Sequence, residues 1–370
     1  YLDRTYTVSS DAHSVQLSPS SSFLVSGASG VLSLKGNSRT SDLLRQSWNN
    51  PSSSVIAVTN GGTLSIANMV SHDAGTLMLA NGAQCNAGGA TLSIGGPLLL
   101  TDSGTSMTLK TLTIGNSQTA TITNHATISA QQLDGKGGWP ESALVVSHGA
   151  TATFSSITNG QVAIEVQDGG TYSVASNVDA KNVDIVISSS NIGNPGVFVV
   201  GSGGTMSLHQ SGSLSIGSGG VFSVANGATG ETTISGPISI NAGTVTVDAN
   251  ALLRFDAAST IYVQPQSTFN INGNLTIGGY TTLNIDNSTF SISPPGYLIV
   301  TDSASLYISA DSTLSGFPDR LVWESSGSLS LPPGITFNIA KPTTFSSGTM
   351  LLNDTTLQVV SGGSLTFVGT

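Results

Sequence analysis

Short strands that alternate apolar and hydroxyl side chains recur along the whole chain. In TLSI at 91–94, Leu92 and Ile94 face one way and Ser93 faces the other. Such a period of two is typical of a strand that is buried on one face and solvated on the other. No apolar pattern with a period of 3.6 residues continues for long enough to predict a substantial helix. The pattern therefore predicts an all-β protein.

A turn rich in Gly or Asn precedes many of these strands, so turn and strand together form an approximate repeat. Its fullest form, Gly-Gly-Thr-Φ-Ser-Φ with Φ an apolar residue, occurs at 61–66, 169–174 and 203–208. Related copies lie at 87–94, 148–154, 218–224, 241–247 and 361–367. Self-similarity at a coil-sized period favours a β-solenoid, because a solenoid grows by stacking similar coils.

We expect one continuous β-solenoid over residues 1–370. Val, Ile and Leu would fill a narrow core, Ser, Thr and Asn would form outward ladders, and Gly and Asn would supply corners with positive φ. The alternative is a chain of two or three β-sandwich domains, since sandwiches also use alternating strands joined by short turns. A single sandwich does not accommodate 370 such residues, so we prefer the solenoid.

The repeat resembles the parallel β-helix superfamily. Within that superfamily it is closest in pattern to bacterial haemagglutinin-type and autotransporter passenger solenoids, and the resemblance covers most of the chain. The resemblance implies a single-stranded parallel β-helix with short loop insertions. It also implies a secreted or surface-displayed fibre, which is often adhesive. It carries over no catalytic residue.

Three segments interrupt the repeat, at 36–54, 131–142 and 316–327. We interpret them as loops that leave the solenoid core. They contain all three tryptophans of the chain, and Trp and Arg are favoured anchors at protein interfaces. The candidate contacts to a neighbouring subunit or a glycan are Trp48, Trp139, Trp323, Arg45 and Arg320. The alternative is that each Trp folds back as a lid on its own loop.

The charge pattern narrows the choice of partners. Only 8% of residues are charged, the net charge is −10, and the ten Lys and Arg residues are scattered singly. Nucleic-acid binding needs clustered cations, so no nucleic-acid partner is expected. No apolar run approaches 18 residues, so no membrane insertion is expected either. The single cysteine, Cys85, cannot form an intrachain disulfide, which leaves a buried or free thiol or an interchain bond.

No catalytic or metal site is evident in the sequence. Polysaccharide lyases and hydrolases on solenoid folds group their carboxylates on one face, whereas the Asp residues here are dispersed and mostly lie at turns, where Asp is common anyway. The five histidines lack the spacing of metal ligands, and no cofactor motif occurs. We therefore predict a protein that is not an enzyme and holds no cofactor. A polysaccharide lyase or hydrolase is the least favoured alternative.

Three Asn-x-Ser/Thr sequons are possible glycosylation sites, at Asn274, Asn287 and Asn353. They are compatible with an extracellular or cell-surface location.

The expected function follows from the two ends of the solenoid. Residues near both ends already show the strand pattern, and we see no polar or helical cap, so we expect the ends to be covered by another subunit. Head-to-tail contact of this kind builds an open filament. We therefore predict a structural subunit of an extracellular filament or surface fibre, a homopolymer of this chain. The alternative is a cell-surface adhesin or glycan-binding solenoid that works through the Trp-bearing loops.

Overall fold

The computed structural model is a parallel β-solenoid with about 12 turns in its two units together. The described residues contain strands and no helix, which confirms the predicted fold class. They group into unit 1, Tyr1–Ser173, and unit 2, Val174–Thr370. The structure describes residues 5–8, 22–27, 31–34, 55–67, 69–72, 75–136, 142–158, 162–190, 193–209, 212–228, 230–258, 260–309, 311–316, 320–334, 336–339, 342–345, 349–352 and 354–367.

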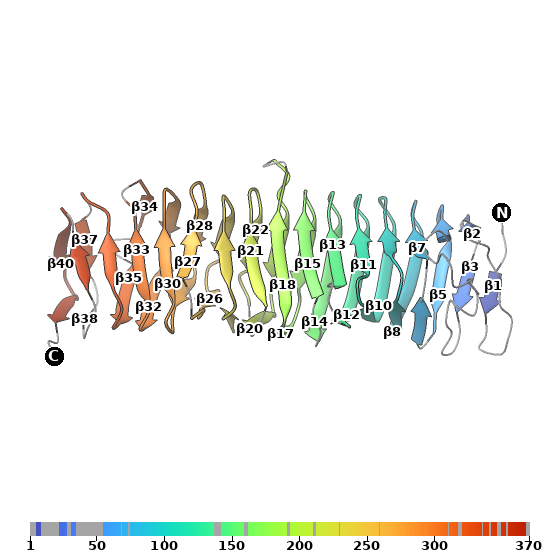
Figure 1. Ribbon diagram of the computed structural model, residues 1–370, viewed down its shortest axis with the longest axis horizontal. Helices are drawn as coiled ribbons and strands as arrows, with labels where there is room; N and C mark the ends of the chain where they lie inside the picture. The colour runs from blue at the N-terminus through green and yellow to red at the C-terminus, as the bar shows by residue number, and fades with distance from the viewer. Residues whose placement is uncertain are drawn as a thin grey trace. The chain divides into compact units, whose positions relative to one another are not determined.

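Two sheets of parallel strands alternate along unit 1, so that the chain passes from one to the other in every coil (Figure 1). Sheet 1A contains, in spatial order, β1 (Thr5–Val8), β3 (Val31–Leu34), β5 (Thr63–Ile66), β8 (Gln84–Ile94), β10 (Ser106–Ile114), β12 (Thr127–Gly135), β14 (Thr151–Thr158) and β16 (Thr171–Val174), and β6 (Met69–His72) also pairs with β8. Sheet 1B contains, in spatial order, β2 (Ser22–Ser26), β4 (Val55–Thr59), β7 (Thr76–Leu79), β9 (Leu98–Leu100), β11 (Thr119–Ile122), β13 (Ser142–Val146) and β15 (Val162–Gln167).

Long strands supply the third side of the coil in unit 1. β5 pairs with the beginning of β8, where Thr63 lies opposite Gln84, and β6 pairs with its end, where Met69 lies opposite Thr91. β8 therefore spans two sides that β5 and β6 cover separately. The register between β8 and β10 shifts at Leu109–Thr111, as a β-bulge at such a corner would produce.

Each complete coil of unit 2 has three strands, one in each of three parallel sheets. Sheet 2C contains β17 (Asn177–Lys181), β20 (Thr205–His209), β23 (Glu231–Ile234), β26 (Leu252–Phe255), β29 (Asn274–Ile277), β32 (Tyr297–Asp302) and β35 (Leu321–Ser325). Sheet 2B contains β18 (Val183–Ser188), β21 (Ser213–Ile216), β24 (Ile238–Ile240), β27 (Thr260–Val263), β30 (Thr282–Ile285), β33 (Ser305–Ile308), β36 (Leu329–Leu331) and β39 (Met350–Leu352). Sheet 2A contains β19 (Val197–Val200), β22 (Val221–Val224), β25 (Thr244–Val247), β28 (Thr268–Ile271), β31 (Thr289–Ile292) and β34 (Thr313–Ser315). Two further pairs join β37 (Thr336–Ile339) to β40 (Thr356–Val359) and β38 (Pro342–Phe345) to β41 (Ser364–Phe367).

The core consists of columns in which one apolar side chain lies above the next. In sheet 1B, one column is fully buried along its whole length and contains Val25, Val58, Leu79, Leu100, Ile122, Val146 and Val166. In sheet 2A, the ring centroids of Phe198 and Phe222 are 5.7 Å apart, and those of Phe269 and Phe290 are 5.0 Å apart. Burial of each such side chain stabilises the fold by about 1.5–3 kcal/mol, so the stability is distributed along the columns.

The predicted positive-φ corners are confirmed. In unit 1, Asn81 and Gly82 have φ values of 53° and 79°, and Asn or Asp residues occupy positive φ at neighbouring corners. The corners also form a backbone ladder, because the N–H of Gly61 donates to the carbonyl oxygen of Asn81 over 3.0 Å. The N–H of His148 donates to the carbonyl oxygen of Asp168 over 2.8 Å in the same way. Asn and Asp suit these positions because their short polar side chains tolerate the left-handed region.

Two of the three predicted loop insertions are shorter than the sequence suggested. Residues 131–135 of the segment 131–142 belong to β12, and residue 142 begins β13. Residues 321–325 of the segment 316–327 form β35. In both cases the many polar residues suggest a loop, although the segment contains a strand with a buried residue. These buried residues are Leu133 in β12 and Leu321 in β35. The segment 36–54 lies outside the described residues.

At Gly170, two neighbouring coils lie so close together that no side chain fits between them. A Cβ at Gly170 would lie 2.2 Å from the carbonyl oxygen of Val146 in the preceding coil, whereas a Cβ at Gly89 would meet no atom within 4 Å. We predict that Gly170→Ala lowers the free energy of unfolding by about 1–3 kcal/mol, since backbone must move to relieve the clash. The matched control Gly89→Ala should change it by less than about 1 kcal/mol. Urea unfolding followed by circular dichroism measures both, and equal effects of the two substitutions would contradict the stacking.

Candidate functional site

The structure describes two of the five predicted interface residues, Arg320 and Trp323, and both contact their own chain. Trp48, Arg45 and Trp139 lie outside the described residues. Arg320 is half-buried, and its guanidinium lies 5.4 Å from the centre of the Tyr297 ring, a cation–π contact. Its Nη1 also donates to the carbonyl oxygen of Gly296 over 3.2 Å. These contacts bind Arg320 to its own chain.

Trp323 is a core residue and not a loop residue, which corrects the expectation from sequence. It lies in β35 opposite Val300, its side chain is 1% exposed, and its ring stacks on Phe345 at 5.6 Å. Its indole N–H donates to the carbonyl oxygen of Ser325 over 3.0 Å. The alternation Leu-Val-Trp-Glu-Ser at 321–325 is the signal that places it inward.

The candidate glycosylation sites differ in their surroundings. Asn274 begins β29, is half-buried, and lines a hollow of about 150 Å³ together with Leu252 and Tyr297. Asn287 is exposed at a turn with a φ of 39°. Asn353 lies outside the described residues. Of the two sequon asparagines that the structure describes, Asn287 therefore has the better steric access.

An ion-pair cluster in unit 2 links Arg254 in β26 with Asp302 in β32, two coils further along. Nη2 of Arg254 lies 3.0 Å from Oδ2 of Asp302, and its Nε lies 3.4 Å from Oδ2 of Asp256. The backbone N–H of Gly279, the hydroxyl of Thr301 and the Arg254 guanidinium hold the pKa of the Asp302 carboxyl below its usual value. Asp302 is therefore ionised at neutral pH and is unsuited to act as a general acid.

A second polar group lies on sheet 2C. His209 contacts the carboxylate of Asp179 through Nε2, and Nζ of Lys181 lies 3.7 Å from the same carboxylate. His72, by contrast, is buried in unit 1, and its Nε2 lies 2.9 Å from the carbonyl oxygen of Gly75. Within the described ranges, no group of three or more His, Cys, Asp or Glu residues is arranged to hold a metal ion.

An aromatic and polar surface on sheet 2B is the candidate binding site. Tyr262 in β27, Asn284 in β30 and Tyr307 in β33 occupy one outward column on three successive strands. We call these three residues the tyrosine column. The sequence alone does not reveal the column, because its members are separated by 22 and 23 residues and only the register brings them together.

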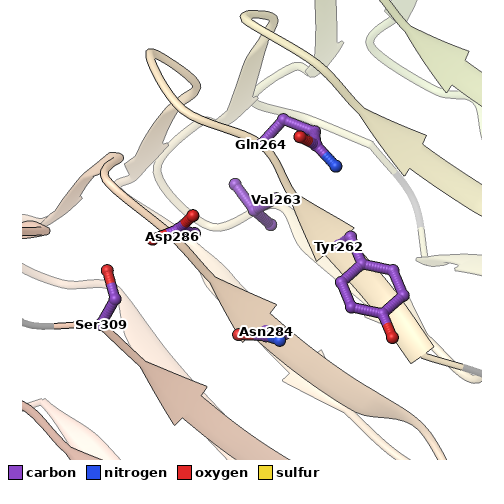
Figure 2. A pocket seen from close by; sticks show the side chains of 6 residues that line it. All are labelled: Tyr262, Val263, Gln264, Asn284, Asp286 and Ser309. Atoms are coloured by element: carbon purple, nitrogen blue, oxygen red, sulfur yellow. The ribbon is translucent and has the colours of Figure 1, made fainter.

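A shallow hollow of about 150 Å³ adjoins the tyrosine column. Gln264, Asp286 and Ser309 each follow the last residue of their strand, so they border the hollow at the ends of β27, β30 and β33 (Figure 2). Val263 and the column residues Tyr262 and Asn284 complete its lining. A second hollow of about 390 Å³ in unit 2 is lined by Ser218, Thr244, Thr268 and other residues without a charged or aromatic side chain.

Comparisons with family models, with curated proteins and with solved structures found no match to this chain. Among the described residues, no helix is long and apolar enough to cross a membrane.

Cys85 belongs to the core. It lies between Leu64 and Met107 in an inward column of sheet 1A, its side chain is 0% exposed, and burial raises the pKa of its thiol to about 12. The thiolate is the reactive form of cysteine, so this thiol is protected both sterically and chemically.

We predict that a disulfide reagent leaves Cys85 unmodified in the native protein at a pH near the free-thiol pKa of about 8.5 and titrates one thiol after unfolding in denaturant. The control is Thr108→Cys in a Cys85→Ala background, which places a thiol on the exposed side of the neighbouring strand β10. That thiol should react at once in the native state. Rapid reaction of native Cys85 would contradict its place in the core.

Proposed function

We propose that the protein is a structural subunit of an extracellular or cell-surface fibre, of the kind formed by the haemagglutinin-type and autotransporter solenoids that its repeat resembles. One observation carries the proposal. The last described coil of unit 2 leaves apolar side chains in water, namely Leu351, Leu352, Val359 and Phe367. Solenoid coils bury such side chains against the next coil, so this surface is suited to receive one.

The aromatic stack in unit 2 also supports the addition of a coil at this surface. Trp323 stacks on Phe345, and Phe345 stacks on Phe367 at 5.6 Å. Phe367 is nevertheless 63% exposed, because one face of its ring has no covering side chain among the described residues. A further parallel coil would continue the stack and bury the Phe367 ring. Burial of this ring alone would stabilise the contact by about 1.5–3 kcal/mol.

The backbone edges and the low charge of this coil are compatible with a coil supplied by a second copy of the chain. β40 and β41 pair with β37 and β38, and β1 in unit 1 pairs with β3, so in the described structure each has one partner strand. A strand with one free edge can accept another strand by β-augmentation. The described residues from 349 to 367 include a single charged side chain, Asp354, so little electrostatic repulsion opposes stacking. Contact between different surfaces of identical copies builds an open filament.

We predict that the chain forms filaments whose length rises with protein concentration, and that Phe367→Asn shifts the assembly threshold upward by about 10-fold or more, which is the effect of losing about 1.4 kcal/mol per contact. Negative-stain electron microscopy and sedimentation velocity give the two readouts. Tyr280→Asn is the matched control, because Tyr280 is also a highly exposed aromatic but lies at a turn beside sheet 2B.

Unchanged assembly of the Tyr280→Asn variant, together with loss of filaments in Phe367→Asn, would support the proposal. A wild-type chain that remains monomeric at high concentration would overturn it. Equal loss in both variants would also overturn it, because the effect would then not come from coil stacking.

A further inference from the structure

The tyrosine column differs from the rest of the outward surface to which it belongs. Tyr262 is 56% exposed and Tyr307 is 38% exposed. The column continues in one direction to Ser239 and in the other to Ser330, which are small and polar. Two phenol rings with a side-chain amide between them are therefore concentrated on three adjacent strands of sheet 2B.

Internal packing does not account for the two rings. They are two strands apart, about 10 Å at the usual strand spacing, which is too far for them to stack on each other. No other aromatic ring of the described residues contacts either of them. Each ring thus presents a flat apolar face to solvent and retains a polar hydroxyl at its tip.

Polar groups with unused hydrogen-bonding capacity surround Tyr262. Within the described structure, no hydrogen bond engages the side chains of Gln264, Asn284 or Asp286. The hydroxyl of Ser309, by contrast, accepts from the N–H of Asn287 at 3.1 Å and lies 3.2 Å from the Ser312 hydroxyl. Two amides supply both donors and acceptors, and the carboxylate supplies acceptors, at the border of one shallow hollow. Figure 2 shows them on the same side of the sheet as the Tyr262 ring.

We propose that this surface binds a neutral saccharide chain that lies across the strands, along the tyrosine column. A sugar ring has an apolar C–H face that packs on an aromatic ring, and a rim of hydroxyls that exchange hydrogen bonds with amides and carboxylates. No Lys or Arg lines the hollow, and Asp286 carries a negative charge there, so an anionic saccharide would be repelled. The hollow is small and shallow, which suits units of an extended chain better than an enclosed ligand.

The distance between the two tyrosines favours a saccharide of several units over a single sugar. Each tyrosine offers one stacking position, and Asn284 between them offers hydrogen bonds to the intervening unit. A chain that occupies both positions gains from effective concentration, because its second contact is intramolecular. We expect an affinity in the range of about 1 mM or slightly tighter for a hexasaccharide, and much weaker binding for a monosaccharide.

The test uses the full chain and a panel of neutral hexasaccharides, namely β-1,3-glucan, β-1,4-glucan, α-1,4-glucan, β-1,4-mannan and β-1,4-linked N-acetylglucosamine. A hexamer of galacturonic acid is the anionic control. Isothermal titration calorimetry or ligand-observed NMR measures binding. We expect at least one neutral hexasaccharide to bind and the anionic one not to bind. Failure of every neutral hexasaccharide to bind, or preferential binding of the anionic one, would overturn the proposal.

Variants then locate the site. Tyr262→Ala and Tyr307→Ala should each weaken binding by about fivefold or more, and the double variant should abolish it. Tyr262→Phe should retain most of the affinity, because it keeps the ring. Tyr280→Ala, which removes an exposed tyrosine outside the column, should change nothing. Binding that survives in the double variant would overturn the proposal. The inference goes beyond the proposed fibre role and is independent of it, since a monomeric chain can bind and a filament can fail to bind.

Discussion

Parallel, in-register hydrogen bonding between consecutive coils is the interaction on which every other feature of this structure depends. It places residues some 20 to 30 positions apart directly above one another, as in the pairs Val58–Leu79 and Phe198–Phe222. Each inward column then becomes a continuous apolar stack, and most outward columns become ladders of mainly Ser, Thr and Asn side chains. The same constraint dictates the corners, where a backbone with positive φ must recur once per coil and Asn, Asp and Gly supply it.

Both proposed functions use places where a column of side chains departs from the pattern of the other columns. The Ser and Thr ladders provide a neutral surface with few charges, which limits electrostatic contacts with neighbouring molecules. The tyrosine column interrupts one of these ladders with rings that the fold does not need. The apolar coil at residues 349–367 is a departure of another kind, because side chains that are buried elsewhere are exposed there. The proposed saccharide binding and the proposed filament contact would therefore use separate surfaces.

The sequence predicted those features that repeat within a single strand and turn. Alternation identified the inward residues, such as Leu92 and Ile94, and the Gly- and Asn-rich turns identified the corners. The polar composition around Trp323 suggests a loop, whereas the apolar residues at 321 and 323 alternate as in a strand, and the alternation is the correct signal. The tyrosine column could not be derived, because the gaps between repeats are irregular and register depends on the length of every intervening turn. Contacts between coils, such as the approach of Gly170 to Val146, cannot be predicted without that same register.

A distance between spin labels tests the in-register stacking most directly. Val199 and Ser315 occupy the same outward column of sheet 2A, which runs through Ser223, Thr246, Asn270 and Ser291. Labels at Val199→Cys and Ser315→Cys, in a Cys85→Ala background, are thus separated by five strand intervals. Double electron–electron resonance should give one narrow distribution centred at about 24 Å, the product of five intervals and the usual strand spacing. A broad distribution, or a distinctly longer distance such as separate sandwich domains would give, would contradict the account.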